Sequence, residues 1–162
     1  MTRQRQGNQP MIKVDRVELL DQLATLVEEF HARARALYGS PALEQYSPSA
    51  IARDYAAALV LGGGELAEHA AREVAMALVG ERAFDDEAFW RTPLGRVIAW
   101  YIGFPRERVQ TSLVGTLLGT SRQYGYRAVV DLDKELRDGS VTVPSEGVRQ
   151  LLRVRQRTLA VT

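Results

Sequence analysis

The fold of this chain is decided by the stretch LLGTSRQYGYRAV, which runs from Leu117 to Val129. Its two leucines lead into Gly119, and glycine adopts the left-handed backbone of a tight turn at no steric cost. The pair Thr120-Ser121 comes next, and hydroxyl side chains favour the position that caps a new helix. The stretch therefore predicts that one helix ends at Gly119 and that a second helix begins near Ser121.

The second helix would place polar groups and aromatic rings on its exposed side. Arginine and glutamine carry the donors and acceptors that match base edges in the major groove of DNA. The hydroxyl residues at the helix start can point at phosphates. The candidate DNA readers are Arg122, Gln123, Tyr124, Tyr126 and Arg127. The alternative is an ordinary exposed helix start on a helical scaffold, because short stretches of this kind also occur by chance.

The neighbouring segments extend this pattern to a helix-turn-helix. We expect a first helix over residues 106–118 and a longer second helix over residues 121–137. Gly115 in the first helix is small where two helices must approach each other closely. Asp138-Gly139 is a turn, and SVTV at 140–143 is the only convincing strand because its valines alternate with period two. A last helix follows this strand.

The chain upstream is also helical in its pattern. Asp15 and Glu18 form a capping box at the start of a helix of about six turns. Ser47-Pro48 and Thr92-Pro93 each place a capping residue before a proline at the first helical position. The triple glycine at 62–64 joins two helices and lacks the lysine of a phosphate-binding loop, so we expect a tight turn. The apolar stripe predicted for the first helix is Val17, Leu20, Ala24, Val27, Phe30, Ala34 and Leu37.

These patterns predict an all-α fold, a multi-helix domain containing a helix-turn-helix with a short β-wing. We divide the chain into a basic N-terminal tail at 1–13 and a helical scaffold or oligomerisation region at 14–80. An aromatic-rich linking helix at 81–105 leads to the helix-turn-helix, wing-like strand and basic C-terminal helix at 106–162. Most of the linking region's aromatic residues are expected in the core, namely Phe89, Trp90, Trp100, Tyr101 and Phe104.

The composition excludes several classes of function. The chain has 162 residues, a net charge of +1 and no cysteine, so disulfides, thiolate catalysis and cysteine metal sites are absent. No apolar run is long enough to cross a bilayer, and the N-terminus does not resemble a signal peptide. We therefore expect a cytoplasmic protein without a membrane partner. Basic residues gather at 1–13, 96–127 and 147–162, which indicates a positive face or ordinary solvated surfaces.

No enzyme chemistry is indicated, and no catalytic residue is assigned. His69 and Glu73 share a helix face but lack a third strong ligand, so we expect no metal and no cofactor. Asp85-Asp86-Glu87 precedes an apolar run, where carboxylates commonly stabilise a helix start. His31 is expected at the surface. A nucleophile with an adjacent base is not visible in the sequence.

The stretch LLGTSRQYGYRAV resembles the pattern LG-small-SRQ-aromatic-x-aromatic-R of small helix-turn-helix regulators. Downstream, LRDGSVTVPSEGVRQLL at 136–152 resembles the wing and following helix of excisionase- and MerR-like winged units of actinobacterial or phage type. The resemblance covers roughly residues 106–155. It implies sequence-specific binding of double-stranded DNA, often by a homodimer on a palindromic or repeated site. It also implies a transcription regulator, such as a repressor, of a phage, plasmid or bacterial mobile element.

The resemblance implies a role for each matching residue. Arg122 and Gln123 would read bases. Outside the matching residues, and by analogy with the arms of homeodomains, Arg3 and Arg5 would form a minor-groove arm, for which the alternative is a disordered tail. Thr120, Ser121 and Tyr124 would mainly contact phosphates. Tyr126 and Arg127 would lie next along the groove, and Arg106 and Arg108 would contact the flanking backbone.

Two features depart from the pattern. Gly125 stands where such regulators usually bury a valine or isoleucine, and a mid-helix glycine costs about 0.5–1 kcal/mol relative to alanine. The link VVDLDKELRDG at 129–139 is longer than usual and carries four acidic residues. These carboxylates must face away from DNA, or the wing is not used for binding.

Two other classes of function compete with a regulator. The stronger is a helical phage structural or assembly protein, of the small-terminase or head–tail adaptor type, which acts by oligomerisation. Such chains are also small, helical, free of cysteine and basic at their exposed ends. A small-ligand sensor is the other class, and it requires an apolar cavity around Trp90 and Trp100.

Overall fold

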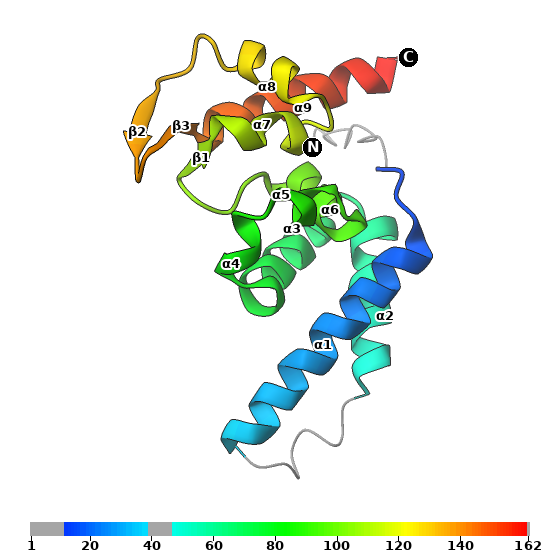
Figure 1. The fold of residues 1–162 in the computed structure, drawn as a ribbon. Coiled ribbons are helices and arrows are strands. Elements are labelled where there is room, and N and C mark those ends of the chain that lie inside the picture. Colours follow the sequence, from blue (N-terminus) through cyan, green and yellow to red (C-terminus); the bar gives the residue numbers. More distant parts are fainter. Residues whose placement is uncertain (1–11, 39–46, 162) are drawn as a thin grey trace, which may run out of the picture.

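The chain forms a mainly α-helical structure with a small antiparallel sheet (Figure 1). The computed structural model describes residues 12–38 and 47–161. The predicted fold class, a multi-helix α domain with a short β-wing, is confirmed, and within it a turn joins α7 to α8 where the sequence predicts the helix-turn-helix. The elements are α1 (Arg16–Tyr38), α2 (Pro48–Leu61), α3 (Gly64–Glu73), a π-helical segment (Val74–Val79), α4 (Glu81–Phe84), α5 (Glu87–Arg91), α6 (Pro93–Ile102), β1 (Arg108–Gln110), α7 (Thr111–Leu117), α8 (Arg122–Ala128), β2 (Glu135–Arg137), β3 (Ser140–Pro144) and α9 (Ser145–Val161).

The side chains predicted to cap helices do so. Asp15 accepts hydrogen bonds from two first-turn amides of α1, both at 3.0 Å. Ser47 accepts one from the first turn of α2 at 3.4 Å, and Thr92 accepts one from the first turn of α6 at 3.2 Å. Between α2 and α3, Gly63 and Gly64 have φ angles of 59° and 47°, which confirms the tight turn predicted from the triple glycine.

The buried face of α1 differs from the predicted stripe. Val17 and Leu37 are 71% and 76% exposed, although the stripe placed them inward. The elements that pack most against α1 are α2, α6 and the π-helical segment, and these cover a neighbouring face. Figure 1 shows the C-terminal part of α1 running away from most other helices, with α2 alongside. The buried residues of α1 are Leu19, Leu23, Val27 and His31, so the surface position predicted for His31 is wrong.

The segment before α7 is a strand, contrary to the helix predicted over residues 106–118. β1 pairs with β3 in antiparallel fashion, and Val109 lies opposite Val143, both of them buried. β2 pairs with the other edge of β3, so the strand order is β1-β3-β2. The segment predicted as the only strand is therefore the central strand of a sheet, and α7 begins at Thr111.

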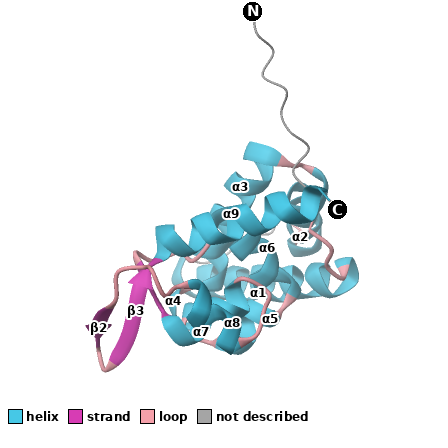
Figure 2. Ribbon diagram, turned by 90° about the horizontal axis from the view of Figure 1, so that it is seen from above, coloured by secondary structure: helices cyan, strands magenta, loops and turns pink. Residues whose placement is uncertain are grey.

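The helix predicted over residues 121–137 ends at Ala128. Beyond this end, Lys134 donates hydrogen bonds of 2.8–3.3 Å to three backbone carbonyls in residues 129–132. These bonds satisfy carbonyl groups that the end of a helix leaves without a partner. The β2–β3 hairpin follows, and both residues of its predicted turn, Asp138-Gly139, have positive φ as a tight hairpin requires. Figure 2 shows this hairpin projecting beyond the helices.

One hydrophobic core joins the parts of the molecule from α1 to α9. Trp90 is buried in this core, and its indole Nε1 donates to the Phe84 carbonyl at 2.8 Å. Tyr101 and Phe104 are also buried, and the other two aromatic residues of this region are partly buried against the core. The prediction that most of these aromatic residues lie in the core is therefore confirmed.

Candidate nucleic-acid interface

The turn between α7 and α8 has the geometry that its sequence predicts. Gly119 has a φ of 70°, in the left-handed region that favours glycine. The backbone N and the Oγ1 of Thr120 donate to the Gly115 carbonyl at 2.7 and 3.1 Å. Ser121 caps α8, because its Oγ accepts a hydrogen bond from the Tyr124 amide at 3.1 Å. Both hydroxyl side chains therefore build the turn, whatever else they contact.

Two glycines let α7 and α8 approach to backbone contact. A Cβ added at Gly115 would lie 2.2 Å from the carbonyl oxygen of Ser121. A Cβ added at Gly125 would lie 2.3 Å from the backbone N of Gly115. The close approach predicted at Gly115 is confirmed. The valine or isoleucine usual at the second position would not fit here, because main-chain atoms occupy the space that its side chain needs.

α8 presents most of its surface to solvent. Its one buried residue is Gly125, which faces α7. The rings of Tyr124 and Tyr126 are about half exposed, at 49% and 45%. Figure 1 shows α8 at the edge of the molecule, beside α7. The residues predicted as readers are thus brought together on one short exposed helix, namely Arg122, Gln123, Tyr124, Tyr126 and Arg127.

A carboxylate from α5 holds Arg122. The Nη2 of Arg122 lies 2.9 Å from Glu87 Oε2, while Glu87 Oε1 accepts from Thr116 at 3.0 Å and from Arg91 at 2.7 Å. The hydrogen bond from Thr116 is the main cause that lowers the pKa of the Glu87 carboxyl, and both arginines add to it. This contact is therefore present at neutral pH and is lost as pH falls through that lowered pKa. The preceding residue, Asp86, caps α5 as the sequence predicts.

An arginine from α9 stacks on α8. The guanidinium carbon of Arg155 lies 5.8 Å from the ring centroid of Tyr124. This cation–π contact adds positive charge to the exposed surface of α8. The sequence marks α9 as basic, but it does not indicate which of the arginines reaches α8, because the contact depends on how the two helices pack.

The β2–β3 hairpin carries acidic side chains beside its basic ones. Asp133 and Glu135 lie 3.8 and 3.6 Å from Arg108, and Asp138 at the hairpin turn is exposed. Glu135 also pairs with Arg137 at 2.9 Å, and this hydrogen bond is the main cause that lowers the pKa of the Glu135 carboxyl. The hairpin therefore offers little net positive charge to a phosphate backbone.

Arg106 and Arg108, predicted to contact the DNA backbone beside the recognition helix, are engaged within the protein. The side chain of Arg108 is only 10% exposed, and it donates to Thr142 and to the Asp133 carbonyl at 2.9–3.0 Å. Arg106 pairs with Asp85 at 2.7 Å. The phosphate role predicted for Arg108 does not fit its burial, because its guanidinium joins β1 to β3 and to the segment before β2.

Arg108→Ala is expected to lower the free energy of unfolding by about 2 kcal/mol, because it leaves acceptors at the buried Thr142 without partners. Arg106→Ala is the matched control, and it should cost less than about 1 kcal/mol because the ion pair and the hydrogen bond to the Glu81 carbonyl that it removes are both exposed. Urea unfolding measures both changes, and amide exchange in β2 and β3 should accelerate only in Arg108→Ala. Equal effects of the two substitutions would contradict the assignment.

The other predicted sites add nothing to this interface. Arg3 and Arg5, predicted as a minor-groove arm, lie outside the described residues. His69 pairs with Glu73 at 3.0 Å on an exposed face, and among the described residues no three metal-ligating side chains come together. In residues 12–38 and 47–161, no helix combines the length and the apolar character that a membrane span requires.

Comparison with known proteins identifies no relative. No family model, curated protein or solved structure matches the chain. The interface is therefore interpreted from the geometry and the charge of its own residues.

Proposed function

We propose that the protein binds double-stranded DNA through α8, with a preference for particular base sequences. The composition of α8 is the observation that supports this most. A helix whose role is to pack normally buries an apolar stripe. α8 buries only Gly125 and otherwise carries mostly arginine, glutamine and tyrosine side chains. Contacts to a partner outside the chain explain this choice of residues better than packing does.

The dimensions of α8 suit the major groove of DNA. An α-helix with its side chains is about 10–12 Å in diameter, which fits a groove about 12 Å wide, and the seven residues of α8 give it a length of about 10 Å. Arg122 and Gln123 open the helix, which is where helix-turn-helix proteins contact base edges. Tyr126 and Arg127 follow farther along the groove. The turn hydroxyls and Tyr124 lie at the end of α8 that phosphates would approach.

The biological role follows from the resemblance over residues 106–155. It is that of a cytoplasmic transcription regulator of a phage, plasmid or bacterial mobile element. A homodimer would present two copies of α8 to a palindromic or repeated site. The proposal requires neither a cofactor nor a metal.

Fluorescence anisotropy with a labelled duplex tests the binding. The logarithm of the association constant should fall linearly with the logarithm of salt concentration, by about 0.9 for each phosphate neutralised. Arg127→Ala should reduce that slope by about 1. Arg33→Ala is the control, since Arg33 is exposed on the part of α1 that Figure 1 shows far from α8. Binding that does not depend on salt, or an equal effect of both substitutions, would contradict the proposal.

A helical assembly protein that acts by oligomerisation remains the second candidate function. An apolar groove between α1 and α2 favours it, and its lining includes Leu19, Leu20, Ala56, Ala57, Val60 and the exposed Leu61. Surface of this kind is typical of contacts between subunits. Light scattering that shows a ring oligomer, together with no salt-dependent duplex binding, would select this function over the regulator.

Glu87→Gln is expected to strengthen duplex binding about threefold at low salt, because it removes a negative charge from beside Arg122 and leaves an acceptor for Thr116. Anisotropy at two salt concentrations measures the change, and the gain should shrink as salt rises. Glu28→Gln, at an exposed position on α1, should leave the affinity unchanged. A weaker or unaltered affinity for Glu87→Gln would contradict the placement of Arg122 at the phosphate backbone or groove.

A further inference from the structure

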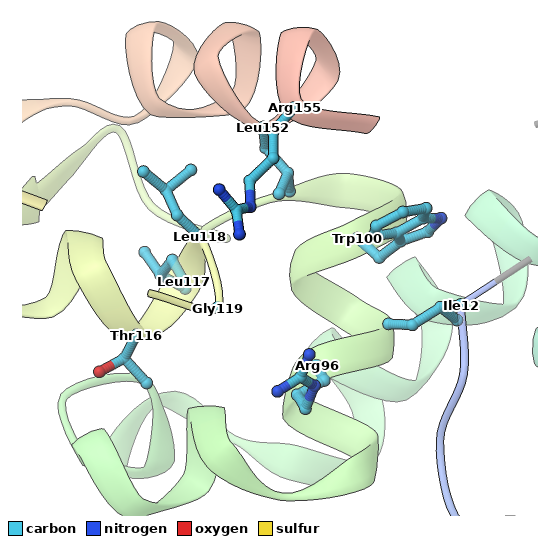
Figure 3. Close-up of a pocket in the computed structure, with 9 residues that line it drawn as sticks. All are labelled: Ile12, Arg96, Trp100, Thr116, Leu117, Leu118, Gly119, Leu152 and Arg155. Atoms are coloured by element: carbon cyan, nitrogen blue, oxygen red, sulfur yellow. The ribbon is translucent and has the colours of Figure 1, made fainter. Parts of the chain in front are cut away.

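A cavity of about 100 Å³ lies behind the turn of the helix-turn-helix, between α6, the end of α7 and α9 (Figure 3). The sensor function considered above requires a cavity around two tryptophans. Trp90 is packed inside the core, whereas Trp100 lines this cavity. The side chains and the glycine used in the argument are Arg96, Trp100, Leu118, Gly119, Leu152 and Arg155.

Two guanidinium groups reach the cavity from different helices. Figure 3 shows those of Arg96 and Arg155 pointing into the space between α6, the end of α7 and α9. Within the described part of the chain, neither of them pairs with a carboxylate. Among the described residues that line the cavity, none is acidic. Two like charges that face one cavity favour a bound anion, because its negative charge offsets their mutual repulsion.

The remaining wall of the cavity is mostly apolar. Leu118 and Leu152 are buried, and the partly buried indole of Trp100 forms one side. A bare inorganic anion or a DNA phosphate would leave this apolar surface without a partner. Ligand sites of this type combine apolar walls with a few placed charges. A carboxylate attached to an apolar or aromatic group matches both the two guanidinium groups and the apolar wall.

We propose that this cavity binds a small organic anion. Its carboxylate pairs with Arg96 and Arg155, since guanidinium groups bind carboxylates through two parallel hydrogen bonds. Its apolar part packs against Trp100 and the adjacent leucines. This assignment concerns the cavity alone and does not depend on DNA binding.

The cavity is also connected to α8. Arg155 lines the cavity and stacks on Tyr124, so an anion that engages its guanidinium competes with that stacking. Arg96 Nη2 lies 3.5 Å from the point where a Cβ would stand on Gly119, the turn residue. Occupancy of the cavity should therefore alter α8 and its turn. The consequence for DNA affinity rests on the proposed function of α8.

Titration of the ¹⁵N-labelled full chain with benzoate, followed by NMR, tests the binding directly. The indole N–H signal of Trp100 should shift and saturate. The signal of Trp90 should stay in place as an internal control, because its indole is buried and hydrogen-bonded to Phe84. Benzamide, which has the same ring without the charge, should bind at least about tenfold more weakly than benzoate.

Matched variants locate the charge recognition. Arg96→Gln and Arg155→Gln should each weaken benzoate binding about tenfold. Arg153→Gln changes an exposed arginine of the same helix, α9, that does not line the cavity, and it should leave the affinity for benzoate unchanged. Inorganic phosphate should shift the Trp100 signal less than benzoate does at equal concentration. Equal binding of phosphate and benzoate, no saturable shift, or shifts of both indole signals would overturn the proposal.

The same samples separate this proposal from the function of α8. Duplex affinity measured with and without saturating benzoate should differ in the wild type and should not differ in Arg96→Gln. Benzoate binding in a protein that does not bind DNA would contradict the function of α8 but support the cavity. DNA binding in a protein that does not bind benzoate would support the function of α8 and contradict the proposal for the cavity.

Discussion

Gly125→Ala is expected to lower the free energy of unfolding by about 3 kcal/mol, although alanine is the better helix former by about 1 kcal/mol. The added Cβ would lie 2.3 Å from the backbone N of Gly115 and 2.7 Å from its Cα. These are main-chain atoms of α7, so they cannot move aside as the end of a side chain would. The substitution must therefore push α8 away from α7.

Gly147→Ala in α9 is the matched control. The atoms nearest to the added Cβ there are the side-chain end of Leu132, at 3.0 Å, which can rotate away. This substitution should be neutral or should stabilise the protein by up to about 1 kcal/mol, through helix propensity. Urea unfolding measures both variants. A stabilising Gly125→Ala would show that α7 and α8 do not meet through their backbones.

Arg122→Ala and Gln123→Ala are each expected to lower affinity for a preferred duplex by about 1–3 kcal/mol, which is about 5- to 150-fold. Both side chains are exposed at the start of α8, and base contacts made there discriminate between sequences. Affinity for unrelated duplexes should fall much less, because phosphate contacts supply most of that binding. Anisotropy with matched and scrambled duplexes measures the difference.

Two further variants sharpen this test. Arg122→Lys keeps the charge but loses the planar fork of donors, so it should keep non-specific binding and lose sequence preference. Arg106→Ala should weaken binding only slightly, because Arg106 is paired with Asp85. Circular dichroism should show an unchanged helix content in all of these variants. A uniform loss of affinity on every duplex would mean that Arg122 and Gln123 contact phosphates alone.

Local sequence rules predict the turn and the caps well. Gly119, Ser121 and Thr92 have the backbone or hydrogen bonds expected of them, because each effect is set within a few residues. The Asp138-Gly139 turn is local in the same sense. The polar residues around Gly125 also indicate that most of α8 is exposed. In the structure Gly125 is the one residue of α8 that is buried, and it faces α7.

Features that depend on distant partners are not predictable in this way. β1 has only three residues, and Val109 becomes a strand residue by pairing with Val143 far along the chain. The last residues of the predicted helix, 135–137, instead form β2 by pairing with β3, and β3 is paired on its other edge with β1 from far along the chain. The burial of His31 depends on which of two adjacent apolar faces of α1 its neighbours cover.

The residues of the candidate interface also differ in whether the sequence alone predicts them. The residues on α8 could be named from the sequence, since a helix start exposes its polar side chains. Glu87 and Arg155 could not, because they reach Arg122 and Tyr124 from α5 and α9 through tertiary packing. Packing also directs the side chain of Arg108 onto Thr142 of β3. The sequence around Arg108 does not indicate this contact and predicts a free guanidinium that could bind phosphate.

A binding selection on random duplex DNA tests the central claim most directly. The full-length protein at moderate salt should enrich one sequence motif from the pool. The same selection with Arg122→Ala or Gln123→Ala should lose preference at particular positions of that motif. A pool without any enriched motif would contradict sequence-specific binding by α8.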